Sequence, residues 1–556
     1  MLKKTMPVLR VAIAQINSKV GDILGNAQKI ASFIEKSKDF GADLVIFPEF
    51  SVTGSPAYDL FTCKSFVKEA EKGIEYLLPH TNGIVAVIPS VRLFGDSLFN
   101  SAYIISKGGV LKSYEKRRIK RLTHLDETRY FHPGDRPCVV SVGGVQLEIL
   151  MGEEFTDYEK RKDTPLILVL DSSIYRVGEI DKKREALKKS FPDLHFCYVN
   201  LVGGQDEWIF YGGSFVGYGE RILSEAKTFE EDLIFFDFEL RGEVSLFEEK
   251  VSKKDYEKPI VPLRGSPPKD VLEKEILKAL ILATKDYAHK NGFQTACLGI
   301  SGGIDSALTA YIASRALGSQ NVTGLFMPSR YTAKESYEDA KQLARNLQIE
   351  LLEVPIDGLI ESYFNLLKGI LVEELREVTV ENIQARIRAN LLMAFSNNKG
   401  ALVLTTSNKS ELATGYFTLY GDSAGGFAVL KDVPKTLIYR LCEYVNKKEG
   451  RFIIPKRVLE KEPSAELKFN QKDTDELPPY HVLDSLIEEY IEGKMGGLEV
   501  ENKPLLETVK ETLMRFFKNE YKRRQAPCGP TISLRSLGRD SDFPITNLWR
   551  YREWSL

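Results

Sequence analysis

The segment that most restricts the fold of this chain is ACLGISGGIDSALTAYIASRALG, residues 296–318. A short apolar run, ACLGI, passes through a pair of glycines into a stretch that ends at Gly318. In that stretch apolar residues recur at the spacing of one helical face, namely Leu308, Tyr311, Ile312 and Ala316. The pattern predicts a strand, a tight glycine turn and a helix, in an α/β domain.

The glycine turn also indicates a ligand. Glycines let backbone N–H groups approach an anion closely, and the N-terminus of a helix supplies further donors and a positive dipole end. A bare Gly-Gly pair would favour an ordinary tight turn, but the full octet GISGGIDS favours a site for phosphate or pyrophosphate. It is neither a Walker loop nor a dinucleotide fingerprint, because it lacks the Gly-Lys-Ser/Thr and the glycine spacing of those motifs. The predicted phosphate-binding residues are Gly299, Ile300, Ser301, Gly302, Gly303, Ile304, Asp305 and Ser306.

A chain of 556 residues is too long for one hydrophobic core, and its pattern changes near residue 240. Before that point, strand-length apolar runs alternate with the amphipathic stretches 26–42 and 64–78, so we predict an α/β domain over 1–240. The charged, proline-containing segment 241–268 is typical of a linker. A second α/β domain is predicted over 269–556.

Composition excludes several classes of function. A net charge of −2 gives no basic field for nucleic acid. The six cysteines lie far apart without a C-x-x-C pair, so zinc, redox and disulfide roles are not expected. No cleavable signal or membrane-length apolar segment is found. We therefore expect a cytoplasmic protein with no membrane or nucleic-acid partner.

SGGIDS resembles the PP-loop of N-type ATP pyrophosphatases. Five further blocks occur in the order seen in NAD+ synthetases, at residues 327–344, 381–393, 405–422, 462–480 and 520–530. Taken alone, the charged segment TSNKSE would suggest a solvated surface loop. The resemblance implies a PP-loop domain of the adenine nucleotide alpha hydrolase type, with a Rossmann-like parallel sheet.

The resemblance also implies a reaction. ATP adenylates the nicotinate carboxylate of deamido-NAD with release of pyrophosphate, and ammonia then displaces AMP to give NAD+. Family motifs place Thr406 at ATP, and Asn382, Glu411 and Lys522 at deamido-NAD. Asp305 and Glu411 carry the oxygen donors that Mg²⁺ prefers, so we expect them to hold that ion, which gives Glu411 two candidate roles. Ser407 is a departure, since the family usually has TGN where this chain has TSN.

The first half resembles the nitrilase (carbon–nitrogen hydrolase) fold, an α-β-β-α sandwich, through blocks 45–54, 114–135 and 200–216. In that family a Glu, a Lys and a Cys release ammonia from glutamine. Glu49 and Lys116 match the first two, although KRRIKR could also be a solvated basic run. The nucleophile position reads MGEE, so Gly152 stands where the cysteine is expected and covalent catalysis is not expected there.

Two neighbouring positions also depart from the glutamine pocket, because Leu122 stands at a family tyrosine and Glu179 at a family lysine. We therefore interpret the domain as a natural pseudo-glutaminase, and the chain as an ammonia-using NAD+ synthetase that forms a homo-oligomer. The first domain is retained for structure or for docking a separate protein that supplies ammonia. One alternative is a glutamine-hydrolysing synthetase whose cysteine was altered by engineering. An alternative of another class is a PP-loop enzyme that modifies RNA.

Overall fold

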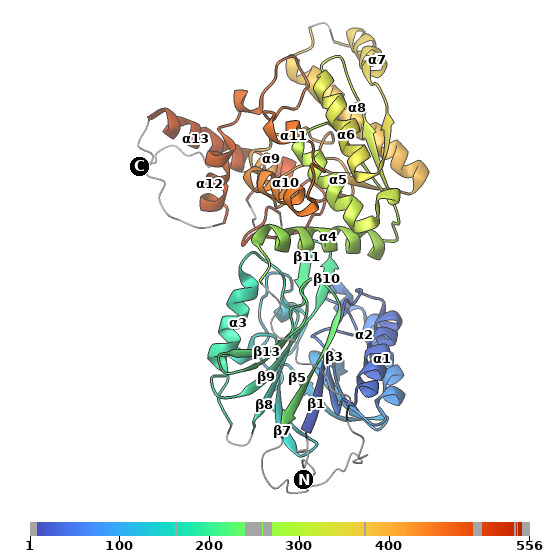
Figure 1. The fold of residues 1–556 in the computed structure, drawn as a ribbon, viewed down its shortest axis with the longest axis vertical. Coiled ribbons are helices and arrows are strands. Elements are labelled where there is room, and N and C mark those ends of the chain that lie inside the picture. The colour runs from blue at the N-terminus through green and yellow to red at the C-terminus, as the bar shows by residue number, and fades with distance from the viewer. Residues whose placement is uncertain are drawn as a thin grey trace. The chain divides into compact units, whose positions relative to one another are not determined.

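A computed structural model of the chain describes residues 8–161, 164–239, 258, 269–371, 374–492, 503–538, 541 and 543–546. The chain divides into two compact units, Met1–Lys269 and Asp270–Leu556 (Figure 1). The predicted linker 241–268 lies outside the described residues except for Lys258.

The first unit contains two six-stranded sheets and a two-stranded ribbon. In spatial order the first sheet consists of β14 (Asp232–Glu239), β1 (Val8–Gln15), β2 (Leu44–Ile46), β3 (Val85–Phe94), β4 (Ser97–Ser106) and β5 (Gly109–Glu115). The second consists of β13 (Arg221–Glu225), β12 (Phe215–Tyr218), β9 (His195–Asn200), β8 (Leu166–Asp171), β7 (Val145–Met151) and β6 (Cys138–Val142). The ribbon pairs β10 (Val202–Gln205) with β11 (Trp208–Tyr211).

Strand periodicity explains how the two sheets pack. In β8, Leu166, Leu168 and Leu170 join the core between the sheets, whereas Ile167 and Val169 pack on the opposite face. Because both faces of β8 are buried, its sequence is a continuous apolar run rather than an alternating one. The same arrangement holds for β1, whose odd-numbered apolar residues face the other sheet.

Helices cover both outer faces, so this unit is the α-β-β-α sandwich that the sequence predicted. Figure 1 shows α1 (Ile23–Asp39) and α2 (Lys64–Leu77) beside the first sheet, and α3 (Glu179–Ser190) beside the second. Helix α1 packs through Ala27, Ile30 and Ile34, which are almost fully buried. The helix begins three residues earlier than the predicted stretch 26–42, because the Asp22 side chain caps it by accepting a hydrogen bond from Gly25 N.

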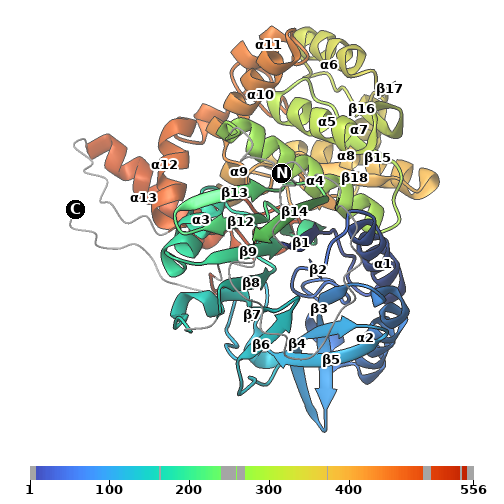
Figure 2. The same cartoon turned by 60° about the horizontal axis from the view of Figure 1, so that its bottom comes forward.

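The direction of the strands gathers several chain turns at one end of the sandwich. Strand β2 is parallel to β3, and β7 is parallel to β8. Strand β5 runs in the direction of β3, because each is antiparallel to β4. Within each sheet, the residues that follow β2 and β5, and those that follow β7 and β8, therefore leave at the same end (Figure 2 labels these strands). The two ends meet, because Glu49 N donates a hydrogen bond to the carbonyl oxygen of Asp171 at the end of β8.

The second unit has a five-stranded sheet in which every described pairing is parallel. Its strands in spatial order are β17 (Glu350–Glu353), β16 (Val322–Phe326), β15 (Ala296–Gly299), β18 (Leu402–Thr405) and β19 (Phe427–Ala428). The chain moves from β15 outward in one direction and then returns to the other side through β18. In open parallel sheets, ligands bind at the carboxyl ends of the strands where the order reverses in this way.

The helices of this unit are α4 (Leu272–Lys290), α5 (Ile304–Leu317), α6 (Lys334–Leu347), α7 (Asp357–Lys368), α8 (Glu377–Lys399), α9 (Lys409–Thr414), α10 (Lys435–Glu449), α11 (Lys456–Glu460), α12 (Tyr480–Tyr490), α13 (Lys503–Lys518) and α14 (Glu520–Arg523). Helix α5 is buried along nearly its whole length, and it follows β15, the middle strand of the sheet. In the part of the chain that is described, no helix is both long and apolar enough to cross a membrane.

Candidate functional site

The glycine turn of the second unit has the predicted geometry. Strand β15 ends at Gly299, and α5 begins at Ile304 after Gly303, which provides no side-chain cap. Gly302 has a φ of +82°, and a β-carbon there would lie 2.4 Å from the Ser336 carbonyl oxygen. Glycine is therefore required, and the uncapped N-terminus of α5 keeps its backbone donors and dipole directed at a ligand site.

A cavity opens over this turn at the reversal of strand order. All eight predicted residues from Gly299 to Ser306 line it, together with Thr406 and Glu411. Ser407, the departure from the family pattern, is buried and lines the same cavity. The structure thus brings the predicted ATP residues and one predicted deamido-NAD residue into one space.

Asn408 contacts both carboxylates that are expected to hold a metal ion, since its backbone N–H also donates to Glu411 Oε2 at 3.3 Å. Its side-chain oxygen accepts a hydrogen bond from Glu411 N at 2.9 Å, which caps α9, and its Nδ2 donates to Asp305 Oδ1 at 2.9 Å. Burial raises the pKa of Glu411 well above its usual range, and the nearby charge of Asp305 adds to this. Two carboxylates that repel each other in a buried site favour a cation between them.

A lysine that the sequence did not single out, Lys435, supplies such a charge. It is the first residue of α10, and its Nζ lies 2.6 Å from Asp305 Oδ2 and 3.9 Å from Glu411 Oε1. Among the described residues, no three His, Cys, Asp or Glu side chains converge as a metal site. Asp305 and Glu411 would therefore supply only part of the shell of a Mg²⁺ ion, and oxygens from a ligand or water would have to supply the rest.

Asn382 and Lys522 do not line the cavity but hold the segment beside it. Asn382 Oδ1 accepts a hydrogen bond from Thr418 Oγ1 at 2.8 Å. Lys522 Nζ donates to the carbonyl oxygens of Gly415 at 2.8 Å and Phe417 at 3.0 Å. Both residues thus fix the segment that leads to Asp422, which itself lines the cavity.

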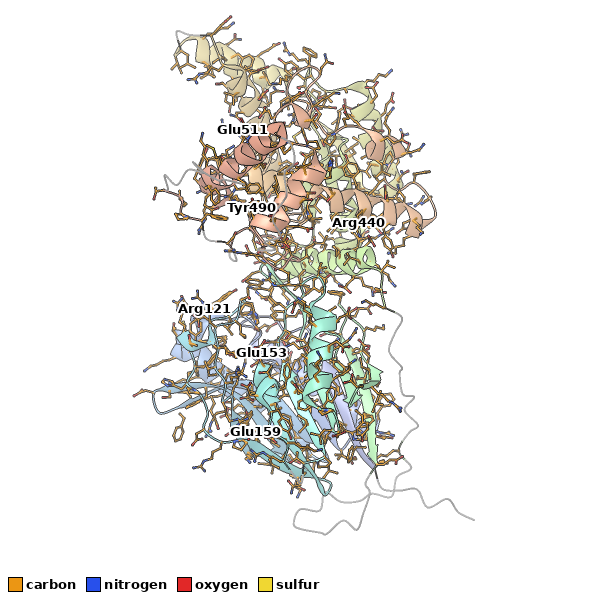
Figure 3. All side chains as sticks on the ribbon, turned by 90° about the vertical axis from the view of Figure 1, so that its left-hand side faces the viewer. Arg121, Glu153, Glu159, Arg440, Tyr490 and Glu511 are labelled. Atoms are coloured by element: carbon orange, nitrogen blue, oxygen red, sulfur yellow. The ribbon has the colours of Figure 1, made fainter. Side chains whose placement is uncertain are left out.

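In the first unit, Glu49 and Lys116 meet as predicted at the ends of β2 and β5. Lys116 Nζ lies 2.7 Å from Glu49 Oε1, and both side chains are almost completely buried. The solvated alternative for the basic run is therefore wrong for Lys116. It holds in part for Arg118 and Lys120, which are one-third exposed and pair with Asp157 and Glu153. Figure 3 labels Glu153 at the strand end and the exposed Arg121 in the facing loop.

Two further groups complete this cluster and were missed from the sequence. Glu127 Oε1 accepts a hydrogen bond from Lys116 Nζ at 2.7 Å, so the lysine lies between two carboxylates. Asn100 Nδ2 donates to Glu49 Oε1 at 2.7 Å. Burial raises the pKa of Glu49 to about 7, opposed by Lys116 and reinforced by Glu127. Neither residue was singled out from the sequence, although Glu127 lies in the block 114–135, because the contacts with Lys116 and Glu49 form only in the fold.

Gly152 stands at the end of β7, at the start of a 3-10 turn (Gly152–Asp157). Its φ is +56°, a region that residues with a side chain seldom adopt. A β-carbon on it would lie 2.7 Å from Lys116 Nζ and 3.8 Å from Glu49 Oε2. The position is thus adjacent to both predicted partners, and the lysine ammonium fills the space into which a side chain would project.

The structure gives local contacts for both positions that depart from the family's glutamine pocket, Glu179 and Leu122. Glu179 is the first residue of α3 and pairs with Lys182 of the same helix at 2.6 Å. One turn further, Lys183 Nζ lies 2.9 Å from Asp171 Oδ2 at the end of β8. Leu122 is half-buried, and its backbone N–H donates to the Leu125 carbonyl oxygen.

Close to Leu122, His124 is buried against two aromatic rings. Its ring centroid is 5.8 Å from that of Phe210 and 6.4 Å from that of Trp208. Burial lowers the pKa of His124 to about 4, with smaller effects from Asp171 and Lys116. The imidazole is therefore neutral at pH 7.

Comparisons with known proteins agree with both units. The carbon-nitrogen hydrolase family profile matches residues 10–242, and the NAD synthase family profile matches residues 276–526. A curated relative from Thermotoga maritima, named glutamine-dependent NAD(+) synthetase, is 40% identical over 99% of this chain and 100% of its own length. One from Aquifex aeolicus, with the same name, is 41% identical over 97% of this chain and 99% of its own.

A solved structure resembles the whole chain as well. The glutamine-dependent NAD+ synthetase from Acinetobacter baumannii, in complex with ADP, is 36% identical with a TM-score of 0.75. The match covers 98% of this chain and all of that one. The similarity in sequence and fold therefore includes both units.

Proposed function

This chain belongs to the family of glutamine-dependent NAD+ synthetases, which are carbon–nitrogen ligases, and from that premise we propose that it converts deamido-NAD to NAD+ with ATP and free ammonia. The proposal has two parts. The second unit performs the ligation, and the first does not release ammonia from glutamine.

The ligation proceeds in two steps. An oxygen of the nicotinate carboxylate attacks the α-phosphorus of ATP, and the bond to the pyrophosphate oxygen breaks. Ammonia then attacks the acyl carbon, AMP leaves with the carboxyl oxygen, and ammonia gives up a proton to a base. Charge builds up on the phosphates in the first step, so the site needs preorganised donors rather than a protein nucleophile.

The residues of the second unit fit this requirement. The backbone of Gly302 and Gly303 and the N-terminus of α5 bind the phosphates, and Thr406 lies across the cavity. Asp305 and Glu411 would hold Mg²⁺, which neutralises charge on the phosphate oxygens. Asn382 and Lys522 position the segment 415–422, against which we place deamido-NAD.

The observation that carries the ammonia proposal is Gly152 between Glu49 and Lys116. A glycine has no group that attacks an amide carbon. Glu49 therefore has no nucleophile to deprotonate, and Lys116 has no tetrahedral oxyanion to stabilise. Lys116 instead bridges Glu49 and Glu127, and Glu179 and Lys182 pair with each other. These contacts favour a natural pseudo-glutaminase over a single engineered change.

The test supplies purified protein with deamido-NAD, ATP and Mg²⁺, and with either ammonium or glutamine labelled with ¹⁵N in the amide. We expect NAD+ with ammonium and none above background with glutamine. Labelled amide nitrogen in NAD+, without another protein, would reject the pseudo-glutaminase proposal and favour a working glutaminase. Failure with both donors would reject the ligase assignment.

We also propose that the chain forms a homo-oligomer, and that the first unit is retained for its structural role or for docking a separate protein that supplies ammonia. The alternative of an RNA-modifying PP-loop enzyme has no support from either matching family.

A further inference from the structure

Lys435 has an unusual place for a lysine in the second unit. It opens α10, and its side chain is only 3% exposed. The N-terminus of a helix carries a positive dipole end, which disfavours a cation. Burial and dipole therefore both oppose its charge, and nearby anions must compensate for both.

The anions are the two proposed metal ligands. Lys435 Nζ is 2.6 Å from Asp305 Oδ2 and 3.9 Å from Glu411 Oε1. Its backbone is fixed as well, because Lys435 N donates to Ser410 Oγ at 2.9 Å. The ammonium also lies over the Tyr480 ring, 5.2 Å from the centroid. The fold thus holds one singly charged ammonium against the two carboxylates that we assign to a divalent metal ion.

Lys435 and a metal ion compete for the same oxygen. A magnesium ion binds a carboxylate oxygen at about 2.1 Å, with little tolerance in geometry. Asp305 Oδ2 is already in close contact with the lysine ammonium. Adding a divalent ion would place three positive charges within a few ångströms in a buried site, where repulsion is poorly screened.

The lysine therefore has to be displaced, and a displaced buried ammonium needs other anions. A triphosphate supplies them, because lysine binds phosphate oxygens readily as a point charge. The phosphate site is adjacent, since Lys435 lines the same cavity as Ser301, Gly302 and Gly303.

We propose that Lys435 is a resident counter-cation that keeps divalent metal off Asp305 and Glu411 until a nucleoside triphosphate enters. Metal and nucleotide then bind together, and the lysine moves from carboxylate to phosphate. This inference rests on the proposed assignment of Asp305 and Glu411 as metal ligands. It does not depend on which nitrogen donor the enzyme uses.

The test measures Mn²⁺ binding by electron paramagnetic resonance, with no nucleotide present. We compare the wild type with Lys435→Met, Asp305→Asn and the double variant. Lys456→Met is the matched control, because it removes an exposed lysine paired with Glu460 in the same unit. We expect the wild type, Asp305→Asn and Lys456→Met to bind weakly and alike. Lys435→Met should bind at least about tenfold more tightly, and the double variant should lose that gain.

Several outcomes would overturn the proposal. One is a wild type that binds Mn²⁺ without nucleotide as tightly as Lys435→Met, with the binding lost in Asp305→Asn. Another is Lys435→Met with no gain although a thermal melt shows it folded. If Lys435→Met does not fold, Lys435→Gln takes its place in the comparison. The comparison of wild type with Asp305→Asn needs neither lysine variant, and tight Mn²⁺ binding that is lost in Asp305→Asn would contradict the proposal by itself. Absence of any Asp305-dependent Mn²⁺ binding, even with an unreactive ATP analogue, would reject the metal assignment and the inference with it, while leaving the ammonia proposal intact.

Discussion

A β-carbon added to Gly152 would lie 2.7 Å from Nζ of Lys116. The lysine ammonium therefore occupies the space that a nucleophilic side chain would enter. The backbone at Gly152 has a φ of +56°, a region that residues with a side chain seldom adopt. Glu49 and Lys116 are instead paired with each other, and Lys116 also pairs with Glu127, in a buried network.

We expect Gly152→Cys to remain without glutaminase activity. The thiol would displace Lys116 from its two carboxylates, and the strained backbone should add about 1 to 3 kcal/mol of destabilisation. Glutamine hydrolysis and a denaturant melt measure the two effects. Gly95→Ala is the control, because Gly95 has a φ of +60° with nothing within 4 Å of an added β-carbon. Glutamine turnover by Gly152→Cys would show that the pocket is still functional.

Lys116→Met should destabilise the protein by about 3 to 5 kcal/mol, because it leaves Glu49 and Glu127 buried without their cation. The rate with ammonium should be unchanged in the remaining folded protein, since Lys116 lies in the first unit and the proposed ligation site lies in the second. Lys182→Met removes an exposed lysine paired with Glu179 and should change stability by less than about 0.5 kcal/mol. Equal effects of the two substitutions on the free energy of unfolding would contradict the buried-network interpretation.

The free energy of unfolding should decrease as the pH is lowered, because of His124. Its pKa is about 4 in the folded protein against an ordinary 6.5, so the unfolded chain takes up a proton first as the pH falls. This favours unfolding below pH 6.5 and should cost about 2 kcal/mol at pH 5 relative to pH 7.5. Phenylalanine does not titrate, so His124→Phe lacks this effect. The unfolding free energy of the wild type minus that of His124→Phe should therefore fall by about 2 kcal/mol between pH 7.5 and pH 5. A difference independent of pH would refute the prediction.

Asp305→Asn should lower turnover with ammonium by about a hundredfold or more and raise the Mg²⁺ concentration needed for half-maximal rate. Asp357→Asn is its control, because Asp357 likewise lies in the first turn of its helix but pairs with the exposed Arg330. A Mg²⁺ titration of the rate distinguishes them. Identical Mg²⁺ dependence in both variants would remove Asp305 from the proposed ligands.

Gly302→Ala should weaken ATP binding and raise KM for ATP by about tenfold or more, because its β-carbon would meet the Ser336 carbonyl oxygen at 2.4 Å. The backbone of the turn or of α6 must then shift. Gly400→Ala has a similar positive φ but open space around it, so it should affect stability alone. ATP titration of the rate in both variants is the measurement. An unaltered KM in Gly302→Ala would contradict the phosphate-loop assignment.

The sequence was most informative where a function depends on neighbours along the chain. The strand, glycine turn and helix over 296–318 could be predicted because local spacing sets them. The pairing of strands into sheets could not, since β9 and β10 follow each other in the chain but belong to different sheets.

Residues that act through distant partners could not be predicted. Lys435 and Asp305 are separated by 130 positions, and Asn100 and Glu49 by 51. Neither pair leaves a local pattern, because each contact depends on which strands and helices become neighbours.

The sequence alone determined the family, the phosphate turn and the glycine at position 152, since each is a matter of residue identity and short spacing. Only the tertiary structure decided that Lys116 fills the space beside Gly152 and that Lys435 lies against Asp305. The physical reason is burial. A charge removed from water must find an opposite charge, and which one it finds depends on the packing of segments far apart in the chain.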